Sequence, residues 1–329
     1  MRITRVDHAD DGALAAWHAA MFAGLGAGRD DPPIVSLDDV RVTYRTPDTS
    51  YLHEAYAALD GETVVGTGQL EAPLRDNPRY ADVEVVVPPE HRRRGVGAAL
   101  WDALHDRCLE LRRTTLGAEI HQPIGAEPVP GWAFAARCGF VHKMTEVRQR
   151  LQLPIAAERL DELEAHAQQR IGAYTLRSWQ GPCPDEYAEQ YARLKGLLAT
   201  DAPLGDLEYE PEVWDVERLR ENERTAAAQG RTVFTTVAVS PAGSLAGHTQ
   251  IGVGDKAHQW DTLVHRDHRG HRLGLAVKVA NLRILTETRP DLRTVGTWNA
   301  PDNGPMIAVN DALGFRPIER NEEWQRIES

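Results

Sequence analysis

The sequence lacks the features that mark a membrane-spanning, exported or disulfide-stabilised chain. No apolar run approaches the roughly 18 residues that a membrane-spanning helix needs, and residues 1–6 contain no apolar core of a signal peptide. The sequence has only three cysteines among its 329 residues, and their spacing fits neither a disulfide framework nor a metal site. We therefore expect a cytoplasmic protein with reduced thiols, no membrane partner and no bound metal.

Positive charge is also scarce. There are 37 lysines and arginines against 49 acidic residues, which gives a formal net charge of -12. Binding to nucleic acid or to an anionic membrane needs a basic surface, so neither partner is expected. The acidic excess is compatible with a cationic amine as substrate. The hydrophobic share of 42% and the charged share of 26% are those of a globular protein, and the length suffices for two domains.

Two common nucleotide-binding patterns are incomplete. Residues 95–100 lack the third glycine and the setting of a dinucleotide fingerprint, and no Lys-Ser or Lys-Thr pair completes a phosphate loop for ATP. What the sequence does contain, twice, is a basic turn with glycines, at residues 90–99 and 266–276. Each follows a strand-like apolar run and opens a helical pattern. Because the first-turn amides of a helix have no internal acceptor, each turn is a candidate site for a diphosphate.

The two turns belong to a longer internal repeat. Residues matched across the repeat lie 177 positions apart, or 175 positions near the end of each half. The matched pairs are Glu84 and Asp261, His91 and His268, Gly97 and Gly274, and the Gly-Phe pairs at 139–140 and 314–315. A period of this length indicates a duplicated domain, since solenoid repeats span only about 20–50 residues.

A strand, an Arg-x-x-Gly-x-Gly turn, a helix, a further strand and a helix that ends at Gly-Phe resemble the GNAT family of acyl-CoA N-acyltransferases. The matching residues are 92–97 and 137–140 in the first half, and 269–274, 298–303 and 310–315 in the second. The tandem layout is similar to that of the mycothiol synthase type. The resemblance implies an α/β class of fold (an α+β mixed sheet) built as two tandem GNAT-like domains. We expect an N-terminal domain at 1–152, a helical connector at 153–170 and a C-terminal domain at 171–329.

The resemblance also implies acetyl-CoA as the cofactor and donor, held at the strand end and the glycine turn. In the first half the implied binding residues are Val87, Arg92, Arg94, Gly95, Val96, Gly97 and Ala98. In the second half they are Leu263, Val264, Arg269, Gly270, His271, Arg272, Leu273, Gly274, Leu275 and Asn303. One departure concerns Arg272, which stands where the family's turn has its first glycine. A side chain there must point outward to leave the phosphates room.

The chemistry of an amine that attacks a thioester needs a base for the ammonium proton and a donor for the oxyanion. Glu84 and Asp261 hold matched strand positions where the family often has its base, although an acid at a sheet margin or in an ion pair is an equally good interpretation. The family's usual tyrosine acid is absent, because its two positions hold Ala135 and Asn310. The acidic stretch 201–212 is implied to line the acceptor pocket, or is simply a solvated loop.

We expect the second domain to be the catalytic one. Its Asn299, Asn303 and Asn310 cluster at a strand-to-helix junction, whereas the equivalent segment of the first domain, residues 120–131, lacks these asparagines and is broken by prolines. The predicted activity is direct transfer of an acetyl group to a primary amine of a small, cationic metabolite or antibiotic. Two alternatives stay open: a non-catalytic acyl-CoA-binding sensor or scaffold, and a protein lysine acetyltransferase. The sequence leaves the choice between monomer and homodimer open.

Overall fold

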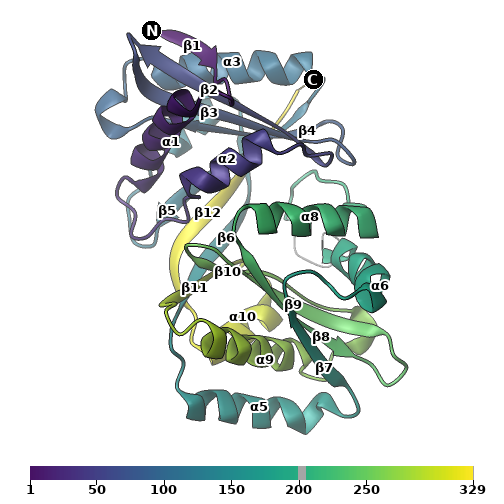
Figure 1. Ribbon diagram of the computed structural model, residues 1–329. Helices are drawn as coiled ribbons and strands as arrows, with labels where there is room; N and C mark the ends of the chain where they lie inside the picture. Colours follow the sequence, from purple (N-terminus) through teal and green to yellow (C-terminus); the bar gives the residue numbers. More distant parts are fainter. Residues whose placement is uncertain (199–204, 329) are drawn as a thin grey trace. The chain divides into compact units, whose positions relative to one another are not determined.

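The computed structural model describes residues 1–198 and 205–328, which divide into two compact units. Of the described residues, unit 1 holds 1–144, 205–210 and 321–328, and unit 2 holds 145–198 and 211–320. Each unit is a mixed sheet with helices on both faces (Figure 1), which is the predicted fold class.

The elements of unit 1 follow the predicted order. They are β1 (Arg2–Arg5), α1 (Asp11–Gly26), α2 (Leu37–Arg45), β2 (Tyr51–Asp60), β3 (Thr63–Pro73), β4 (Tyr80–Val86), a 3-10 turn (Pro89–His91), α3 (Val96–Glu110), β5 (Thr115–Pro123) and α4 (Pro130–Arg137). The strand order is β1-β2-β3-β4-β5, with β12 next to β5. Strands β2 and β3 form a hairpin that turns at Asp60-Gly61, where the glycine has a φ of 63°.

Unit 2 repeats this plan. Its elements are β6 (Val141–Gln152), α5 (Ala157–Ile171), β7 (Thr175–Gln180), α6 (Asp185–Gly196), α8 (Val216–Ala228), β8 (Thr232–Val239), β9 (Leu245–Val253), β10 (Ala257–Val264), a 3-10 turn (Arg266–His268), α9 (Leu273–Thr288), β11 (Thr294–Asn299), α10 (Gly304–Leu313) and β12 (Arg316–Ile327). The strand order is β6-β11-β10-β9-β8-β7. Strands β8 and β9 form a hairpin.

Each unit buries an apolar core on both faces of its sheet. In unit 1, α3 packs on one face over Leu70 and Val83, and α1 packs on the other over Ala55 and Ala57. In unit 2, α9 covers one face, and α6 lies on the opposite face (Figure 1). Apolar side chains alternate along the strands because successive residues point to opposite faces.

The boundaries of the compact units differ from the expected domain limits at 152 and 170. Strand β6 passes from unit 1 into unit 2 after Met144, and β12 passes from unit 2 into unit 1 after Arg320. The helix expected as a connector is α5, which belongs to unit 2. Its apolar stripe, Leu160, Leu163 and Ala167, is buried in the core beneath α9. A helix with one apolar face has to bury that face against a neighbour, which explains why α5 packs against unit 2.

The sheet of each unit opens at one place. In unit 1 the parallel strands β4 and β5 are paired from Tyr80–Thr115 to Asp82–Gly117, although β4 runs on to Val86. In unit 2, β10 and β11 are paired only at Ala257–Val295 and His258–Gly296, although β10 runs on to residue 264. Both pairs of strands therefore diverge toward the end that leads into the basic turn.

Candidate functional site

The two basic turns form as the sequence predicts. Each leads from the end of a strand into the first turn of a helix, α3 or α9. The residue before α3 is Gly95, with a φ of 82°, and the residue before α9 is Arg272, with a φ of 55°. No side chain of the described chain caps either helix. The first-turn N–H groups therefore point at an open end, which is the arrangement that binds anions.

The side chain of Arg272 points away from that helix end. Its guanidinium donates to the backbone oxygen of His166 at 2.6 Å and to Oε1 of Gln169 at 3.0 Å, both in α5. The neighbouring His271 contacts the backbone oxygen of Arg170 through Nδ1 at 3.2 Å. The last carbonyl groups of a helix have no internal partner, so these contacts stabilise the end of α5. The outward orientation that the sequence required of Arg272 is thus present.

The first arginine of each turn ties the turn to the end of its strand. Nε of Arg92 donates to the carbonyl of Val87 at 2.8 Å, and Nε of Arg269 donates to the carbonyl of Val264 at 3.3 Å. The two contacts are equivalent across the repeat, which confirms the internal match at the level of hydrogen bonds. Contact of either arginine with a cofactor stays a prediction.

The other predicted binding residues lie at the strand ends and in the first helical turns. Val96, Leu273 and Leu275 are buried in the cores, so only their backbone N–H groups could meet a ligand. The glycines leave room, since a Cβ added at Gly274 would come no nearer than 3.7 Å to Val264. A Cβ added at Gly97 would lie 3.4 Å from the ring of Phe134. The start of α3 is therefore more crowded than the start of α9.

A cavity of about 170 Å³ is lined by the diverging strands of unit 2. Its lining residues come from β6, β10, α9, β11, the start of α10 and the segment that follows α6. They are Glu146, Leu198, Gln259, Trp260, Asp261, Thr262, Lys278, Thr297, Trp298, Asn299, Ala300, Asn303 and Met306. Asn303 also caps α10, because its Oδ1 accepts from the N–H of Met306 at 3.4 Å. The structure thus brings Asp261 and Asn303 to one cavity, and their proposed roles as base and cofactor contact stay predictions.

Strand β10 contains a bulge beside this cavity. The register against β9 shifts between Gln259, opposite Ile251, and Thr262, opposite Thr249, so Trp260 and Asp261 together face the single residue Gln250. A bulge leaves its extra residue outside the ladder and reorients the side chains next to it. The corresponding part of β4 pairs regularly with β3. Side chains of a regular strand point alternately to the two faces of the sheet. This alternation holds along β4 and is broken in β10 at the bulge.

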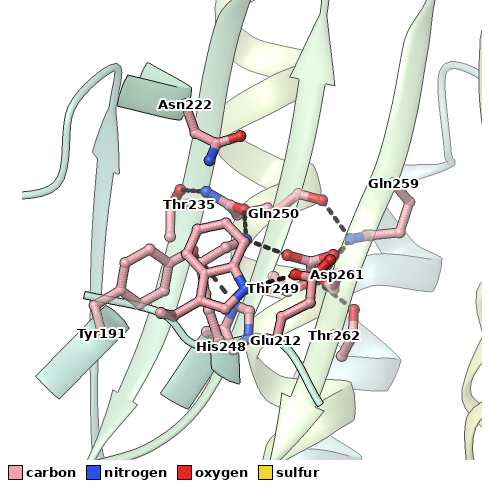
Figure 2. A network of polar contacts seen from close by, with 12 residues as sticks. Tyr191, Glu212, Asn222, Thr235, His248, Thr249, Gln250, Gln259, Asp261 and Thr262 are labelled. Carbon is pink, nitrogen blue, oxygen red and sulfur yellow. Dashed lines mark hydrogen bonds and ion pairs between the residues drawn. The ribbon is translucent and has the colours of Figure 1, made fainter. Parts of the chain in front are cut away.

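Asp261 takes part in a polar network on the α6 side of the sheet (Figure 2). Its carboxylate accepts a short hydrogen bond from Nζ of Lys195, which also donates to Oε1 of Gln250 at 2.9 Å. Burial raises the pKa of Asp261, but the Lys195 ammonium outweighs this, so the pKa is below its ordinary value. Asp261 is therefore a carboxylate already engaged by a cation, and its role as base stays a prediction.

The network extends to His248 and Trp214, which the sequence did not single out, and to Tyr191 and Glu212. Nδ1 of His248 lies 3.4 Å from the hydroxyl of Tyr191. Burial, with Lys195 nearby, lowers the pKa of His248 to about 3, so its imidazole is neutral. The Lys195 ammonium lies 4.8 Å from the ring centre of Trp214, whose indole N–H donates to Glu212 at 2.8 Å.

Glu84, the matched residue of unit 1, is in a different setting. It lies opposite Gln69 in the regular β3–β4 ladder. Burial raises the pKa of its carboxyl to about 7, while Arg29 acts weakly in the other direction. The two acids that match in sequence thus differ in protonation: Asp261 is held ionised, and Glu84 titrates near neutrality.

The acidic stretch 201–212 divides between the two units. Residues 201–204 lie outside the described residues. The N–H of Glu210 donates to Oδ1 of Asn77 at 2.6 Å within unit 1, whereas Glu212 belongs to unit 2. That the stretch lines an acceptor pocket stays a prediction.

Two titratable residues of the cavity were missed by sequence reasoning. Glu146 in β6 is half-buried, and burial raises the pKa of its carboxyl. Lys278 in α9 is 1% exposed. A lysine among the apolar positions Leu275, Val279 and Leu282 was a usable signal for Lys278, whereas β6 as a whole was not expected as a strand.

Two searches of the described residues for other kinds of site gave negative results. No group of three or more His, Cys, Asp or Glu side chains there is arranged to hold a metal ion. No helix in that part of the chain has the length and apolar character that crossing a membrane requires.

Comparisons with known proteins show a likeness to acetyltransferases. Residues 24–140 match the model of the acetyltransferase (GNAT) family. A mycothiol acetyltransferase of Rhodococcus erythropolis is 32% identical over 132 residues, which cover 40% of this chain and 38% of that protein. A mycothiol acetyltransferase of Saccharomonospora viridis is 27% identical over 253 residues, which cover 73% of this chain and 72% of that protein.

Solved structures extend the likeness to both units. A tandem GNAT protein from the clavulanic acid biosynthesis pathway matches with a TM-score of 0.78 and 29% identity, over 99% of this chain and 98% of that chain. A GCN5-related N-acetyltransferase from Sphaerobacter thermophilus matches with a TM-score of 0.64 at 16% identity, over 99% and 95% of the two chains, which indicates the fold alone. Together, the relatives support an N-acetyltransferase.

Proposed function

With the acetyltransferase (GNAT) family matched in residues 24–140 and the tandem GNAT fold present in the whole chain, we propose that the protein moves an acetyl group from acetyl-CoA to the primary amine of a small, cationic molecule. Unit 2 is the catalytic half in this proposal. The acceptor is a soluble metabolite or antibiotic, and transfer is direct.

The cavity of unit 2 is the observation that carries the proposal. It is lined by the diverging strands β10 and β11 and by Lys278 of α9, the helix whose uncapped first turn follows the basic turn. A diphosphate on the amides of α9 would leave the arm of the cofactor to run between the two strands. Asn299 and Asn303 supply polar contacts along this path, and Trp298 and Met306 supply apolar ones.

The residues of the cavity suggest how transfer would proceed. An attacking ammonium must first lose a proton, and Glu146 is a suitable acceptor because burial raises its pKa toward the working range of a base. The β10 bulge at Trp260 and Asp261 offers backbone N–H groups for an oxyanion. The ion pair of Lys195 and Asp261 fixes the strand at this point, so the donor geometry is set before substrate binds.

The names of the two curated relatives point to one acceptor to test first. The acceptor substrate of mycothiol acetyltransferase belongs in an initial panel, together with aminoglycoside-like and polyamine-like amines. The panel also includes peptides that contain lysine, which a protein lysine acetyltransferase would acetylate instead. An acyl-CoA-binding protein without catalytic activity would bind the donor and turn over none of them.

The experiment that tests the proposal is calorimetric titration of acetyl-CoA into the wild type and two matched variants. Gly274→Glu places a carboxylate at the proposed diphosphate site of unit 2, and Gly97→Glu does the same in unit 1. We expect Gly274→Glu to weaken binding about tenfold or more, equivalent to about 1.4 kcal/mol, and Gly97→Glu to leave it unchanged. Loss only in Gly97→Glu would move the site to unit 1, and no wild-type binding would refute the proposal.

A further inference from the structure

Lys278 is a buried lysine without a carboxylate partner among the described residues. Its side chain is 1% exposed. Nζ donates to Oδ1 of Asn310 at 2.7 Å and lies 5.5 Å from the ring centre of Phe315. A neutral amide and an aromatic face compensate only part of the cost of burying an ammonium. Burial accordingly lowers the pKa of Lys278 to about 7, so the side chain gains and loses a proton near neutrality.

Acidic side chains that could neutralise Lys278 lie on β6, β10 and α5. Glu146 of β6 and Asp261 of β10 line the same cavity, and Asp261 is bound by Lys195. On α5, which packs against α9, Asp161 and Glu164 pair with Arg283 at 2.5 Å and 2.9 Å. Asp261, Asp161 and Glu164 are thus engaged by other cations, and neither they nor Glu146 forms an ion pair with Lys278 in the described chain.

The repeat shows that the fold does not need a lysine at this place. The matched position of unit 1 is Trp101, an apolar residue of the core that packs on Phe140. Phe315, the counterpart of Phe140, lies against Lys278 in the same way. One copy thus fills this place with an indole, and the other fills it with a lysine that lines the cavity of unit 2.

A polar chain holds the amine in place. Asn310 accepts from Lys278 and donates through Nδ2 to Oε1 of Gln149 at 3.0 Å. The same Oε1 lies 3.5 Å from Nδ2 of Asn299 on β11. Because Asn310 presents its oxygen to Lys278 and its amino group to Gln149, the ammonium has a fixed direction and keeps N–H groups for a further acceptor.

We propose that the Lys278 ammonium protonates the thiolate that leaves when an amine attacks the thioester. The inference rests on the proposed function and names the acid for that reaction. The N–C bond forms, the C–S bond breaks, and the electron pair left on sulfur takes a proton from Nζ. The proton lost by the attacking nitrogen passes to a carboxylate or water, and solvent returns a proton to Nζ, so the overall products are amide and CoA thiol.

The test uses free CoA and needs no acceptor. The ultraviolet absorbance of the thiolate is followed against pH for CoA bound to the wild type, to Lys278→Met, to Lys278→Arg and to the control Lys256→Met, whose lysine lies outside the cavity lining. A thiol in water has a pKa of about 8.5. In the wild type and in Lys256→Met the thiol is expected to titrate at least about one unit lower than in Lys278→Met. Lys278→Arg should keep the lower value, because it keeps the charge.

Equal thiol titration in the wild type and Lys278→Met, with CoA bound to both, would overturn the inference and leave the proposed function standing. Failure of the wild type to bind CoA would overturn both. A measurement on the wild type alone covers the case in which Lys278→Met does not fold. The ultraviolet absorbance of the thiolate, followed at a fixed pH of about 7.5, should rise when CoA binds to the wild type and should not rise when desulfo-CoA, which has no sulfur, binds. Absence of that rise with CoA bound would refute the inference.

Discussion

The ion pair of Lys195 and Asp261 gives the most direct test of how unit 2 is built. The two side chains are 10% and 18% exposed, so the pair is largely withdrawn from water. The change Asp261→Asn removes the negative charge while keeping the size of the side chain. It leaves the Lys195 ammonium next to a neutral His248, with Oε1 of Gln250 as a remaining acceptor at 2.9 Å.

The expected cost follows from these contacts. Removing one partner of a buried ion pair costs about 3–5 kcal/mol, because the other charge stays buried without compensation. The hydrogen bond to Gln250 and the ring of Trp214 recover about 1 kcal/mol of this. We therefore expect Asp261→Asn to lower the free energy of unfolding of unit 2 by about 2–4 kcal/mol at neutral pH.

The measurement is urea unfolding followed by tryptophan fluorescence, for the wild type, Asp261→Asn, Lys195→Met and the double variant. The double variant should lose less than the sum of the two single losses, by about 1–3 kcal/mol. The pKa of Asp261 is below its ordinary value of 3.8, so its contribution is complete above that pH and disappears as the pH falls through the folded-state pKa. Additive losses, or a loss in Asp261→Asn that persists unchanged in acid, would refute the reasoning.

Two other predictions concern the turn of unit 2 and a histidine of unit 1. Arg272→Gly should change the affinity for acetyl-CoA less than about threefold, because the side chain points to α5. The stability lost with its hydrogen bonds, worth about 1 kcal/mol each, is offset in part by relief of the left-handed backbone. A large gain in calorimetric affinity would show that the side chain blocks the phosphates. Burial acts to lower the pKa of His53, but Asp48 and Glu71, at 3.4 Å and 3.2 Å, raise it to about 9. The contribution of the His53 cation to the stability of the fold is therefore complete below about pH 6.5 and is lost as the pH rises through about 9. Over that pH range the free energy of unfolding in urea should fall by up to about 3 kcal/mol more in the wild type than in His53→Gln. Parallel pH profiles of the two proteins would contradict this.

The repeat made much of the fold accessible from sequence. Glycine turns, apolar strands and the offset of 177 residues between Gly97 and Gly274 predicted two α/β units with a basic turn in each, and the structure has both. These patterns are local: a strand alternates with period two, and the first turn of a helix leaves its N–H groups without internal acceptors. The path of β6 and β12 between the units was not predicted, because strand partners are set by contacts between distant residues.

The candidate site was predicted in part. The backbone positions of the turns followed from the sequence pattern, and the place of Asn303 at the start of α10 was implied by the resemblance to the GNAT family. The state of the acids did not: Asp261 and Glu84 match in sequence, but one is bound by Lys195 and the other is buried with only a weak influence of Arg29. A pKa depends on neighbours brought together by folding, so equal positions in a repeat can hold groups in different protonation states.

The sequence by itself therefore predicted the duplication, the class of fold and the two basic turns, and it indicated the likeness to GNAT proteins that the comparisons support. Only the tertiary structure decided which sheet opens into a cavity, that β10 carries a bulge, and that Lys278 lies buried at the cavity wall beside Asn310. The physical reason is that helices, strands and turns depend on residues a few positions apart. Burial, ion pairs and cavity shape depend instead on side chains that are tens of positions or more apart in the chain, such as Lys195 and Asp261 or Lys278 and Asn310.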